Sequence, residues 1–449
     1  MKNILKKIIS YILRIESRLV LSKYKPKIIA ITGSVGKTST KDAVYAVLSK
    51  VSYVRKSEKS YNSEIGLPLT ILGVPNGWNN PLIWLQNIFK GLWLFIWAHQ
   101  YPKWLVLEVG VGKEGDMRHT ASWLKTDIVI ITGIGETPAH IEFFSSRKNL
   151  IEEKSSLIKT LKNDGLLILN ADDVDVLEMK TKTKNLTVTY GFKAGADILG
   201  SGDKIFYDNR GVPKGVIFRI DEGGLARGTM AEGTSLPVVI EGVFGRNHIY
   251  ASLASLALAS GLKFNIINAI NELKNYDVSP GRIRLLEGIN NSLIIDDTYN
   301  SSPSASQSAL QTLGDIRRET ESKGRKIAIL GDMLELGRHT EEAHKNIGRI
   351  AGKTLSENTD VLIVVGPRAK AIKEGAILEG MNQVNIFEFL DSRKASDFIK
   401  TFVQKGDLTL VKGSQGMRME RVVEAILFDK ENKKKLLVRQ DDEWLKKNN

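Results

Sequence analysis

The chain has 449 residues, of which 42% are hydrophobic and 26% charged, as in ordinary globular proteins. This composition excludes a disordered, a collagen-like and a multi-span membrane protein. The chain has no cysteine, which excludes disulfides, cysteine-ligated metal centres and thiol nucleophiles.

The N-terminal segment carries more than half of the net charge of +13, because residues 1–27 hold eight basic residues and one acidic residue. The rest of the chain is only mildly basic and has no nucleic-acid-binding motif, so we expect no nucleic-acid partner. Residues 4–21 predict an amphipathic helix. Its apolar residues at helical spacing are Ile4, Ile8, Ile12, Ile15 and Leu19. Two interpretations stay open: a helix lying on an anionic membrane surface, or one packed on the protein body.

Residues 78–104 form a second unusual segment, which holds five of the seven tryptophans. Its apolar run is interrupted by Gln86, Asn87 and Lys90, so it is too short for a membrane-spanning helix. Tryptophan prefers the lipid–water interface. Segments 1–25 and 78–104 therefore both favour contact with a membrane surface. The alternative is a buried helix, or one that packs against the N-terminal helix.

From residue 28 onwards, strand and helix patterns alternate, which is typical of an α/β protein with a parallel sheet. The strands predicted first are 27–32, 104–109, 127–132 and 166–170. Residues 193–242 predict β-hairpins beside that sheet, and residues 249–261 a helix. Near 279–282 the chain changes domain. The strands predicted for the second unit are 293–297, 326–330, 361–365 and 408–411, and we expect a frayed tail from Asp429.

The strand at 27–32 leads into a glycine-rich turn followed by a helix start. Its glycines let backbone amides point at a phosphate, and Lys37 adds a positive charge. The Thr38 hydroxyl suits Mg²⁺, and the helix N-terminus favours an anion. We therefore predict nucleoside triphosphate binding. The residues predicted to hold it are Gly33, Ser34, Val35, Gly36, Lys37, Thr38 and Ser39.

Further motifs follow in a fixed order along the chain. They are TGSVGKTST at 32–40, NSEIGLP at 62–68, LEVG at 107–110, GIGETPAHIEF at 133–143, NADD at 170–173, DDTYNSSP at 296–303, GDMLELG at 331–337 and KGS at 412–414. With these motifs, residues 28–428 resemble the Mur ligase family, the ATP-dependent enzymes that add amino acids to the peptidoglycan stem. Within the family, the motifs fit best the members that add D-alanyl-D-alanine to a UDP-linked muramoyl tripeptide.

The resemblance implies the fold and the reaction. It implies a central ATPase domain over 28–279 with a mostly parallel P-loop-type sheet, then a smaller Rossmann-like domain over 280–449. The implied enzyme is an ATP-dependent, ADP-forming amide ligase that activates a muropeptide carboxylate as an acyl phosphate. The incoming amine is D-alanyl-D-alanine or similar. We also expect a cytoplasmic monomer, which would lie at the inner face of the membrane if segments 1–25 and 78–104 bind it.

The resemblance also implies roles for single residues. Thr38, Glu108 and His140 would bind two Mg²⁺ ions, and Lys154 would be carbamylated to act as a further ligand. Lys37, His140, Lys154 and Arg282 are the implied catalytic residues. From the residues alone, the alternatives are a capping carboxylate for Glu108, a structural histidine for His140 and a surface lysine for Lys154.

The remaining implied contacts concern the nucleotide and the acceptor. Asp297 would hold the ribose, and Asn247 or His248 the base, although GRNHIYA at 245–251 departs from the family pattern and leaves these base contacts open. The implied contacts with the acceptor are Asn62, Tyr299, Asn300 and Ser301.

A second departure lies before the phosphate loop, where the family carries a domain that holds the UDP-sugar. Here the basic segment 1–27 and the tryptophan-rich segment 78–104 stand in its place, so we hypothesise that the acceptor sits on a lipid carrier. Two other functions stay open. One is a family ligase for another amino acid or peptide, and the other a non-catalytic, membrane-associated ATP-binding regulator. The intact motif residues argue against the regulator.

Overall fold

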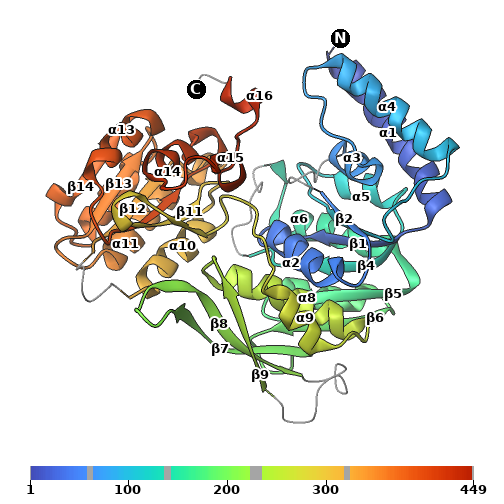
Figure 1. The fold of residues 1–449 in the computed structure, drawn as a ribbon, viewed down its shortest axis with the longest axis horizontal. Coiled ribbons are helices and arrows are strands. Elements are labelled where there is room, and N and C mark those ends of the chain that lie inside the picture. The colour runs from blue at the N-terminus through green and yellow to red at the C-terminus, as the bar shows by residue number, and fades with distance from the viewer. Residues whose placement is uncertain (1, 58–63, 136–142, 223–234, 318–323, 447–449) are drawn as a thin grey trace.

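Two β-sheets flanked by helices organise the chain (Figure 1). The computed structural model describes residues 2–57, 64–135, 143–222, 235–317 and 324–446. In this part of the chain the first sheet has nine strands in the order β2-β3-β1-β4-β5-β6-β7-β8-β9. They are β1 (Lys27–Thr32), β2 (Val54–Lys56), β3 (Trp104–Glu108), β4 (Thr126–Ile131), β5 (Leu161–Asn170), β6 (Leu186–Gly191), β7 (Ile198–Tyr207), β8 (Pro213–Glu222) and β9 (Ser235–Glu241).

Neighbouring strands from β2 to β7 are parallel, whereas β7, β8 and β9 pair antiparallel. The predicted parallel sheet is therefore confirmed, and the predicted hairpins continue the same sheet at its edge. Ile29 and Ile31 of β1 pack in one apolar cluster, and Ile28 and Ala30 pack in another. Because both faces are covered, the strand is apolar throughout, as buried parallel strands are.

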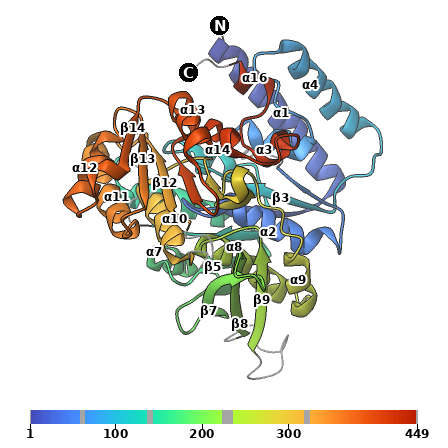
Figure 2. The ribbon, with the colours of Figure 1, turned by 60° about the vertical axis from the view of Figure 1, so that its left-hand side comes forward.

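Helices cover both faces of this sheet. One cluster includes α2 (Lys37–Ser49), α8 (Arg246–Gly261) and α9 (Ile266–Leu273). The other includes α1 (Lys2–Tyr24), α3 (Gly66–Leu72), α5 (Asp116–Ala121) and α6 (Arg147–Ser155). The helix α4 (Pro81–Ile96) lies alongside α1, and α7 (Val174–Glu178) follows β5 (Figure 2). No helix within the described ranges is both long enough and apolar enough to span a bilayer.

The second sheet has six described strands in the order β10-β11-β15-β12-β13-β14, with only β10 antiparallel to its neighbour. They are β10 (Arg284–Glu287), β11 (Leu293–Asp297), β12 (Lys326–Gly331), β13 (Val361–Val365), β14 (Ile386–Phe389) and β15 (Leu408–Lys412). The helices of this unit are α10 (Pro303–Asp315), α11 (Thr340–Thr354), α12 (Lys370–Leu378), α13 (Ser392–Phe402) and α14 (Glu420–Ile426).

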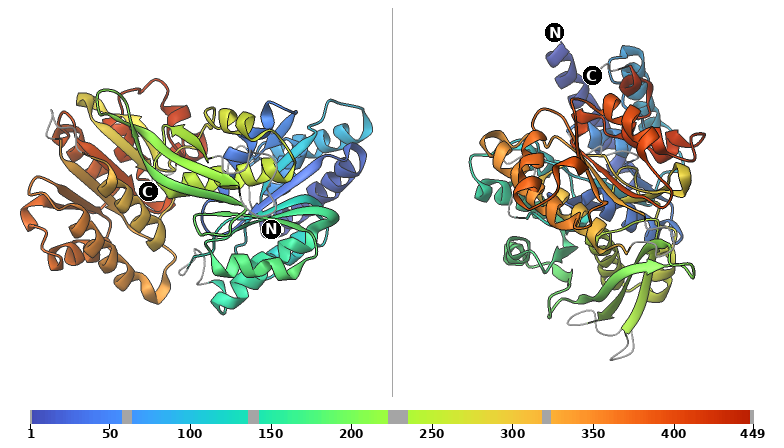
Figure 3. Two further views of the ribbon diagram at one scale, coloured as in Figure 1. Left: turned by 90° about the horizontal axis from the view of Figure 1, so that it is seen from below. Right: turned by 90° about the vertical axis from the view of Figure 1, so that its left-hand side faces the viewer.

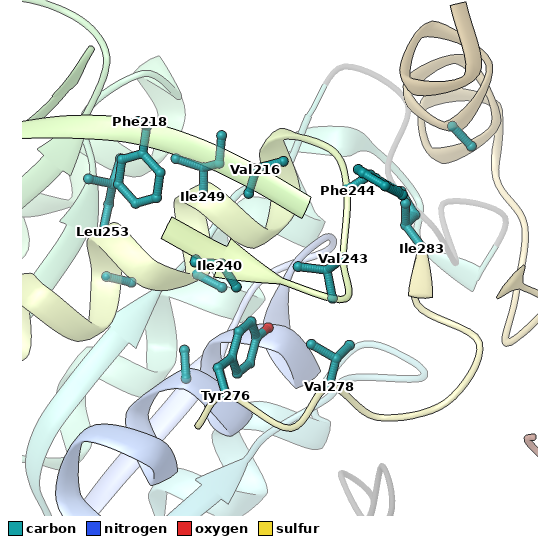
Figure 4. Packing of buried hydrophobic residues seen from close by; sticks show 14 of the residues in the cluster. Val216, Phe218, Ile240, Val243, Phe244, Ile249, Leu253, Tyr276, Val278 and Ile283 are labelled. Atoms are coloured by element: carbon teal, nitrogen blue, oxygen red, sulfur yellow. The ribbon is translucent and has the colours of Figure 1, made fainter. Parts of the chain in front are cut away.

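The two units lie side by side, as Figure 3 shows, and one apolar cluster runs through both. Phe244 and Ile283 stand where the first unit meets the second (Figure 4). The domain boundary that we expect at 279/280 falls in the segment between α9 and β10. That short segment brings Arg282 towards the phosphate loop.

The expectation of a frayed tail from Asp429 is wrong for its described part. Residues 429–446 form two short helices, α15 (Lys433–Leu436) and α16 (Asp442–Leu445), with Leu437 and Val438 buried. Arg439 is also buried, and it donates to the Thr298 and Tyr299 carbonyls at 2.5 and 3.1 Å. Charge alone predicted disorder, but the tail packs against the second unit.

Candidate active site

The phosphate loop is a tight turn whose glycines are sterically required. Gly33 and Gly36 have φ of +146° and +84°, and a Cβ on Gly33 would lie 2.0 Å from the Thr132 Oγ1. The backbone amide of Ser34 donates to the Gly133 carbonyl at 2.7 Å. α2 begins at Lys37, whose Nζ donates to the carbonyls of Gly33 and Ser34 at 2.9 and 3.3 Å. The loop thus joins a strand end to a helix start with its lysine folded over it.

Thr38 and Glu108 place two oxygen atoms beside this loop. Glu108 ends β3, where it pairs in register with Ile31 of β1. The Thr38 hydroxyl donates to the Glu108 Oε2 at 3.0 Å, and both residues are buried. A buried carboxylate is costly unless it is paired or bound to a cation. Lys41, one turn after Lys37, has its Nζ 3.9 Å from the same oxygen. Lys41 was not among the predicted site residues, although its i+4 spacing from Lys37 was a usable signal.

Lys154 reaches the same loop from α6. Its Nζ donates to the Gly33 carbonyl at 3.0 Å, and the residue is only 4% exposed. The interpretation of Lys154 as a surface lysine is therefore wrong. Burial, and then the nearby charge of Lys37, hold the pKa of Lys154 well below its usual range. Burial is also the main cause of the lowered pKa of Lys37.

The second unit contributes residues from the other side. Arg282 donates from its Nη2 to the Thr38 hydroxyl at 3.2 Å and lies over the Tyr299 ring, 3.9 Å from its centroid. Asp297 ends β11, and its Oδ2 lies 2.5 Å from the Lys412 Nζ. Burial raises the pKa of Asp297, and Lys412 opposes that shift. Lys412 also donates to the Asn300 carbonyl at 3.0 Å, which ties the turn after β11 to the site.

His248 is buried with both ring nitrogens in contact with protein atoms. Nε2 lies 2.6 Å from the Arg282 carbonyl oxygen and Nδ1 3.0 Å from the Tyr276 hydroxyl. Burial lowers its pKa to about 4, so the imidazole is neutral at pH 7. In this arrangement His248 orients the segment that carries Arg282.

These side chains line one cavity of about 810 Å³. The predicted residues that it brings together are Ser34, Val35, Gly36, Lys37, Thr38, Ser39, Glu108, Lys154, Asn247, His248, Arg282, Asp297, Tyr299, Asn300 and Ser301. Asn62 and His140 lie outside the described residues. The phosphate loop and residues far along the chain thus face the same space.

A second cavity of about 780 Å³ adjoins the first, since Val35, Gly36, Asn247 and Ala305 line both. Its other walls include Arg147, Asp172 and Tyr250, whose hydroxyl donates to the Asp172 Oδ2 at 2.7 Å. Arg147 and Tyr250 were not among the predicted site residues, because neither lies in a sequence motif typical of phosphate or metal binding. Val35 and Gly36 of the phosphate loop thus border both cavities.

Two family models match the chain in sequence. The Mur ligase middle domain matches residues 31–259, and the Mur ligase, glutamate ligase domain matches residues 281–415. The chain belongs to the Mur ligase family. The motif resemblance described above is therefore confirmed, and so is the α/β fold that it implied.

Two relatives of this Mur ligase share one specific name. The UDP-N-acetylmuramoyl-tripeptide–D-alanyl-D-alanine ligase of Bacillus subtilis is 27% identical over 416 residues, which covers 92% of this chain and 78% of that protein. The Escherichia coli enzyme of the same name is 25% identical, covering 89% and 76%. The MurF ligase of Thermotoga maritima in complex with ADP is similar in structure, with a TM-score of 0.72, 26% identity, and coverage of 93% and 83%.

Proposed function

We propose that this Mur ligase forms an amide bond between a muropeptide carboxylate and D-alanyl-D-alanine or a similar amine, at the expense of ATP. The observation that carries the proposal is the meeting of Lys37, Thr38, Glu108 and Arg282 in one cavity formed by both units. The relatives from Bacillus subtilis and Escherichia coli, which span most of the chain, are named for this reaction.

The reaction has two steps. A carboxylate oxygen of the acceptor takes the γ-phosphoryl group, which forms an acyl phosphate and releases ADP. The amine nitrogen then bonds to the carbonyl carbon, the carbon–oxygen bond to the phosphate breaks, and inorganic phosphate leaves as the nitrogen loses a proton. Such chemistry needs positioning and charge neutralisation more than enzyme nucleophiles. Lys37 and Arg282 bring positive charge to the phosphoryl group from opposite sides.

The donor set fits Mg²⁺ as the metal. The Thr38 hydroxyl and the Glu108 carboxylate are hard oxygen ligands 3.0 Å apart beside the phosphate loop. Within the described residues no group of three acidic or histidine side chains is close enough to hold a metal by itself. This suits Mg²⁺, which commonly keeps waters and substrate phosphates as ligands. When bound by Thr38 and Glu108, the Mg²⁺ ion would neutralise negative charge on the nucleotide phosphates. Our proposal keeps His140 at a second such ion.

Carbamylation of Lys154 is part of the proposal. Two lysines, Lys37 and Lys154, donate to the single Gly33 carbonyl, and no described carboxylate lies within ion-pair distance of Lys154. Carbamylation would turn this buried cation into an anion and remove the repulsion. The carbamate oxygens would then face the phosphate loop as metal ligands.

We further propose how the substrates divide the space. The base and ribose take the cavity beside Asn247, with Asp297 and Arg282 approaching from the second unit, and the acceptor meets Asn62, Tyr299, Asn300 and Ser301. We infer a monomer that contacts the inner face of a membrane through residues 1–25 and 78–104.

The experiment measures ADP release from ATP and Mg²⁺ with muropeptide acceptor and D-alanyl-D-alanine, together and singly. We expect ADP release and amide product only when both are present. Lys37→Ala should lower the rate by about 10²–10³-fold, because one preorganised cation at the phosphate is lost. Lys50→Ala, at the exposed end of the same helix, is the matched control. ADP release that ignores both substrates would contradict the ligase assignment.

A further inference from the structure

α4 leaves an unusually large apolar surface exposed. Its buried residues are Asn87 and Gly91, a polar side chain and the smallest one. Trp84, Ile88 and Leu94 pack partly buried against the body. The large apolar side chains that α4 leaves exposed are Leu82, Leu85, Phe89, Leu92, Trp93, Phe95 and Ile96. Surface helices normally bury their apolar stripe, and contiguous exposed apolar patches mark interaction sites.

α1 adds a parallel stripe to this surface. Ile9, Leu13 and Val20 pack into the body, and the exposed large apolar residues of its other side are Ile8, Tyr11, Ile15 and Leu19. Ile8, Ile15 and Leu19 belong to the stripe predicted from the sequence. Thus α1 both packs on the protein and exposes Ile8, Ile15 and Leu19 of its predicted apolar stripe.

The two helices form one fixed unit, lying side by side in Figures 1 and 2. Lys23 donates from its Nζ to the carbonyls of Leu94 and Phe95 at 3.1 and 2.7 Å. The Tyr24 hydroxyl donates to the Leu94 carbonyl at 2.9 Å. These contacts satisfy the C-terminal carbonyls of α4, which the helix itself leaves open. The apolar surface is therefore presented by an ordered helix pair.

The charged residues of α1 and α4 indicate what kind of partner this apolar surface binds. The sequences of α1 and α4 contain a single acidic residue, Glu16, which is 3% exposed and points at Gly91. Lys7, Arg18 and Lys90 are exposed. Trp93 and Trp97, at the end of α4, stack with centroids 4.0 Å apart. Apolar and tryptophan side chains among basic groups suit an anionic lipid surface, whereas a second copy would bring like charges together.

The same helix pair reaches the wall of the active-site cavity. Arg14 of α1 contacts the Nε2 of His119 on α5, and this nitrogen lies 3.6 Å from the Glu64 Oε1. His119 and Glu64 both line the cavity that holds the phosphate loop, together with Lys113. One flank of the cavity therefore borders the helix that carries the exposed apolar stripe.

We propose that the α1–α4 face, which consists of the exposed apolar side chains of these two helices, binds to an anionic lipid surface. We also propose that the acceptor enters past α5 as a lipid-linked muropeptide. This inference rests on the proposed ligase function. Confining enzyme and acceptor to one surface raises their effective concentration, so docking increases turnover of a lipid-linked acceptor but not of a soluble one.

Flotation with phosphatidylglycerol and with phosphatidylcholine vesicles tests docking. The variant Leu82→Glu/Phe89→Glu charges two residues that are 66% and 64% exposed. Its matched control, Leu390→Glu/Phe428→Glu, charges residues that are 69% and 68% exposed on the second unit. We expect the unchanged protein and the control to float with phosphatidylglycerol vesicles, and to float less with phosphatidylcholine vesicles. The α4 variant should remain in the bottom fraction with both. Failure of the unchanged protein to float would overturn the proposal. The proposal would also be overturned if light scattering without lipid showed a dimer of the unchanged protein that the α4 variant does not form.

ADP release tests the carrier. We use the same muropeptide in two forms, UDP-linked in solution and lipid-linked in phosphatidylglycerol vesicles. With the lipid-linked form, the α4 variant should be slower than the control by at least about tenfold. With the soluble form, the two variants should match. Equal rates on vesicles would overturn the lipid-linked entry. Absence of ADP release with either form would instead refute the ligase function, while the flotation result would stand.

Discussion

At the scale of single residues, the phosphate loop concentrates positive charge on one backbone oxygen. Lys37 and Lys154 donate to the Gly33 carbonyl at 2.9 and 3.0 Å. Two ammonium groups that donate to the same carbonyl oxygen lie close enough to repel each other, and burial disfavours the charged form of each. The lowered pKa of Lys154 means that more of its amine is neutral at pH 7 than for an exposed lysine, and this fraction rises with pH. The neutral amine is the form that combines with carbon dioxide.

We therefore expect carbamylation of Lys154 to be visible directly. With ¹³C-bicarbonate, the protein should show a carbamate carbon signal that Lys154→Ala abolishes and that fades as the pH is lowered. The control Lys159→Ala removes an exposed lysine nearby and should keep the signal. Lys154→Ala should also slow ADP formation by about 10²–10³-fold, in line with the loss of one preorganised charged group. A signal that survives Lys154→Ala would assign the carbamate elsewhere.

At the scale of helices and strands, the contact between α1 and α4 buries a carboxyl group. A Cβ added to Gly91 would lie 2.2 Å from the Glu16 Oε2, so the helices approach closely there. Neither carboxyl oxygen has a hydrogen-bond partner in the part of the chain that the structure describes. Burial accordingly raises the pKa of Glu16 from 4.5 to about 7. Between these values the unfolded chain releases a proton that the folded chain keeps, so stability falls as the pH rises from 4.5 to about 7.

Glu16→Gln should remove this dependence. At pH 8 the unchanged protein holds a buried carboxylate, which costs more than a buried amide. The variant should then melt a few degrees higher, and the difference should vanish towards pH 4.5. Calorimetry over this pH range measures it, with the exposed Glu431→Gln as the control. A constant difference at every pH would show that the carboxyl does not titrate in the contact.

The tail after Asp429 is a second element with a role in the site. Arg439 forms an ion pair with Glu420 and donates to the carbonyls of Thr298 and Tyr299. The Tyr299 ring in turn lies under the Arg282 guanidinium. Arg439 is thus a positioning residue that fixes the turn facing the phosphate loop.

Arg439→Met should displace this turn and lower kcat by about 10–100-fold, because a small misplacement of reacting groups costs that much. Nucleotide affinity should change little, since the phosphate loop is untouched. Arg439→Lys keeps the positive charge but loses the bidentate geometry of the guanidinium, so its kcat should lie between those of the unchanged protein and Arg439→Met. Lys430→Met, in the same tail but exposed, should match the unchanged protein. An unaltered kcat in a folded Arg439→Met protein would remove the positioning role.

At the scale of the whole molecule, the two units share a hydrophobic cluster as well as a cavity. Phe244 and Ile283 are buried where the units meet (Figure 4). Because the same junction brings Arg282 to Thr38, packing and catalysis depend on the same placement of the units.

Phe244→Ala should destabilise the protein by about 3–5 kcal/mol and divide a single melting transition into two. Phe218→Ala is the matched control, since this equally buried ring packs within the first unit against α8. It should lower the melting temperature without dividing the transition. Calorimetry distinguishes the two outcomes, and a single transition in Phe244→Ala would mean that the junction does not couple the units.

Local patterns predicted the framework well. β1, β11 and β13 have the predicted bounds, because their continuous apolar runs end at turn residues. The phosphate loop was also predictable, since its glycines, lysine and threonine are consecutive. Arg147 and Arg439 were not, because their partners lie elsewhere in the chain and no local pattern marks them.

The sequence by itself determined the family, the bounds of several strands and the chemistry of the phosphate loop, because spacing and residue type are local properties. Only the tertiary structure decided that Lys154 is buried, that the charged tail folds back, and that α4 turns its apolar side chains outwards. Burial and charge pairing depend on which distant element covers a side chain, and periodicity specifies a face without specifying its neighbour.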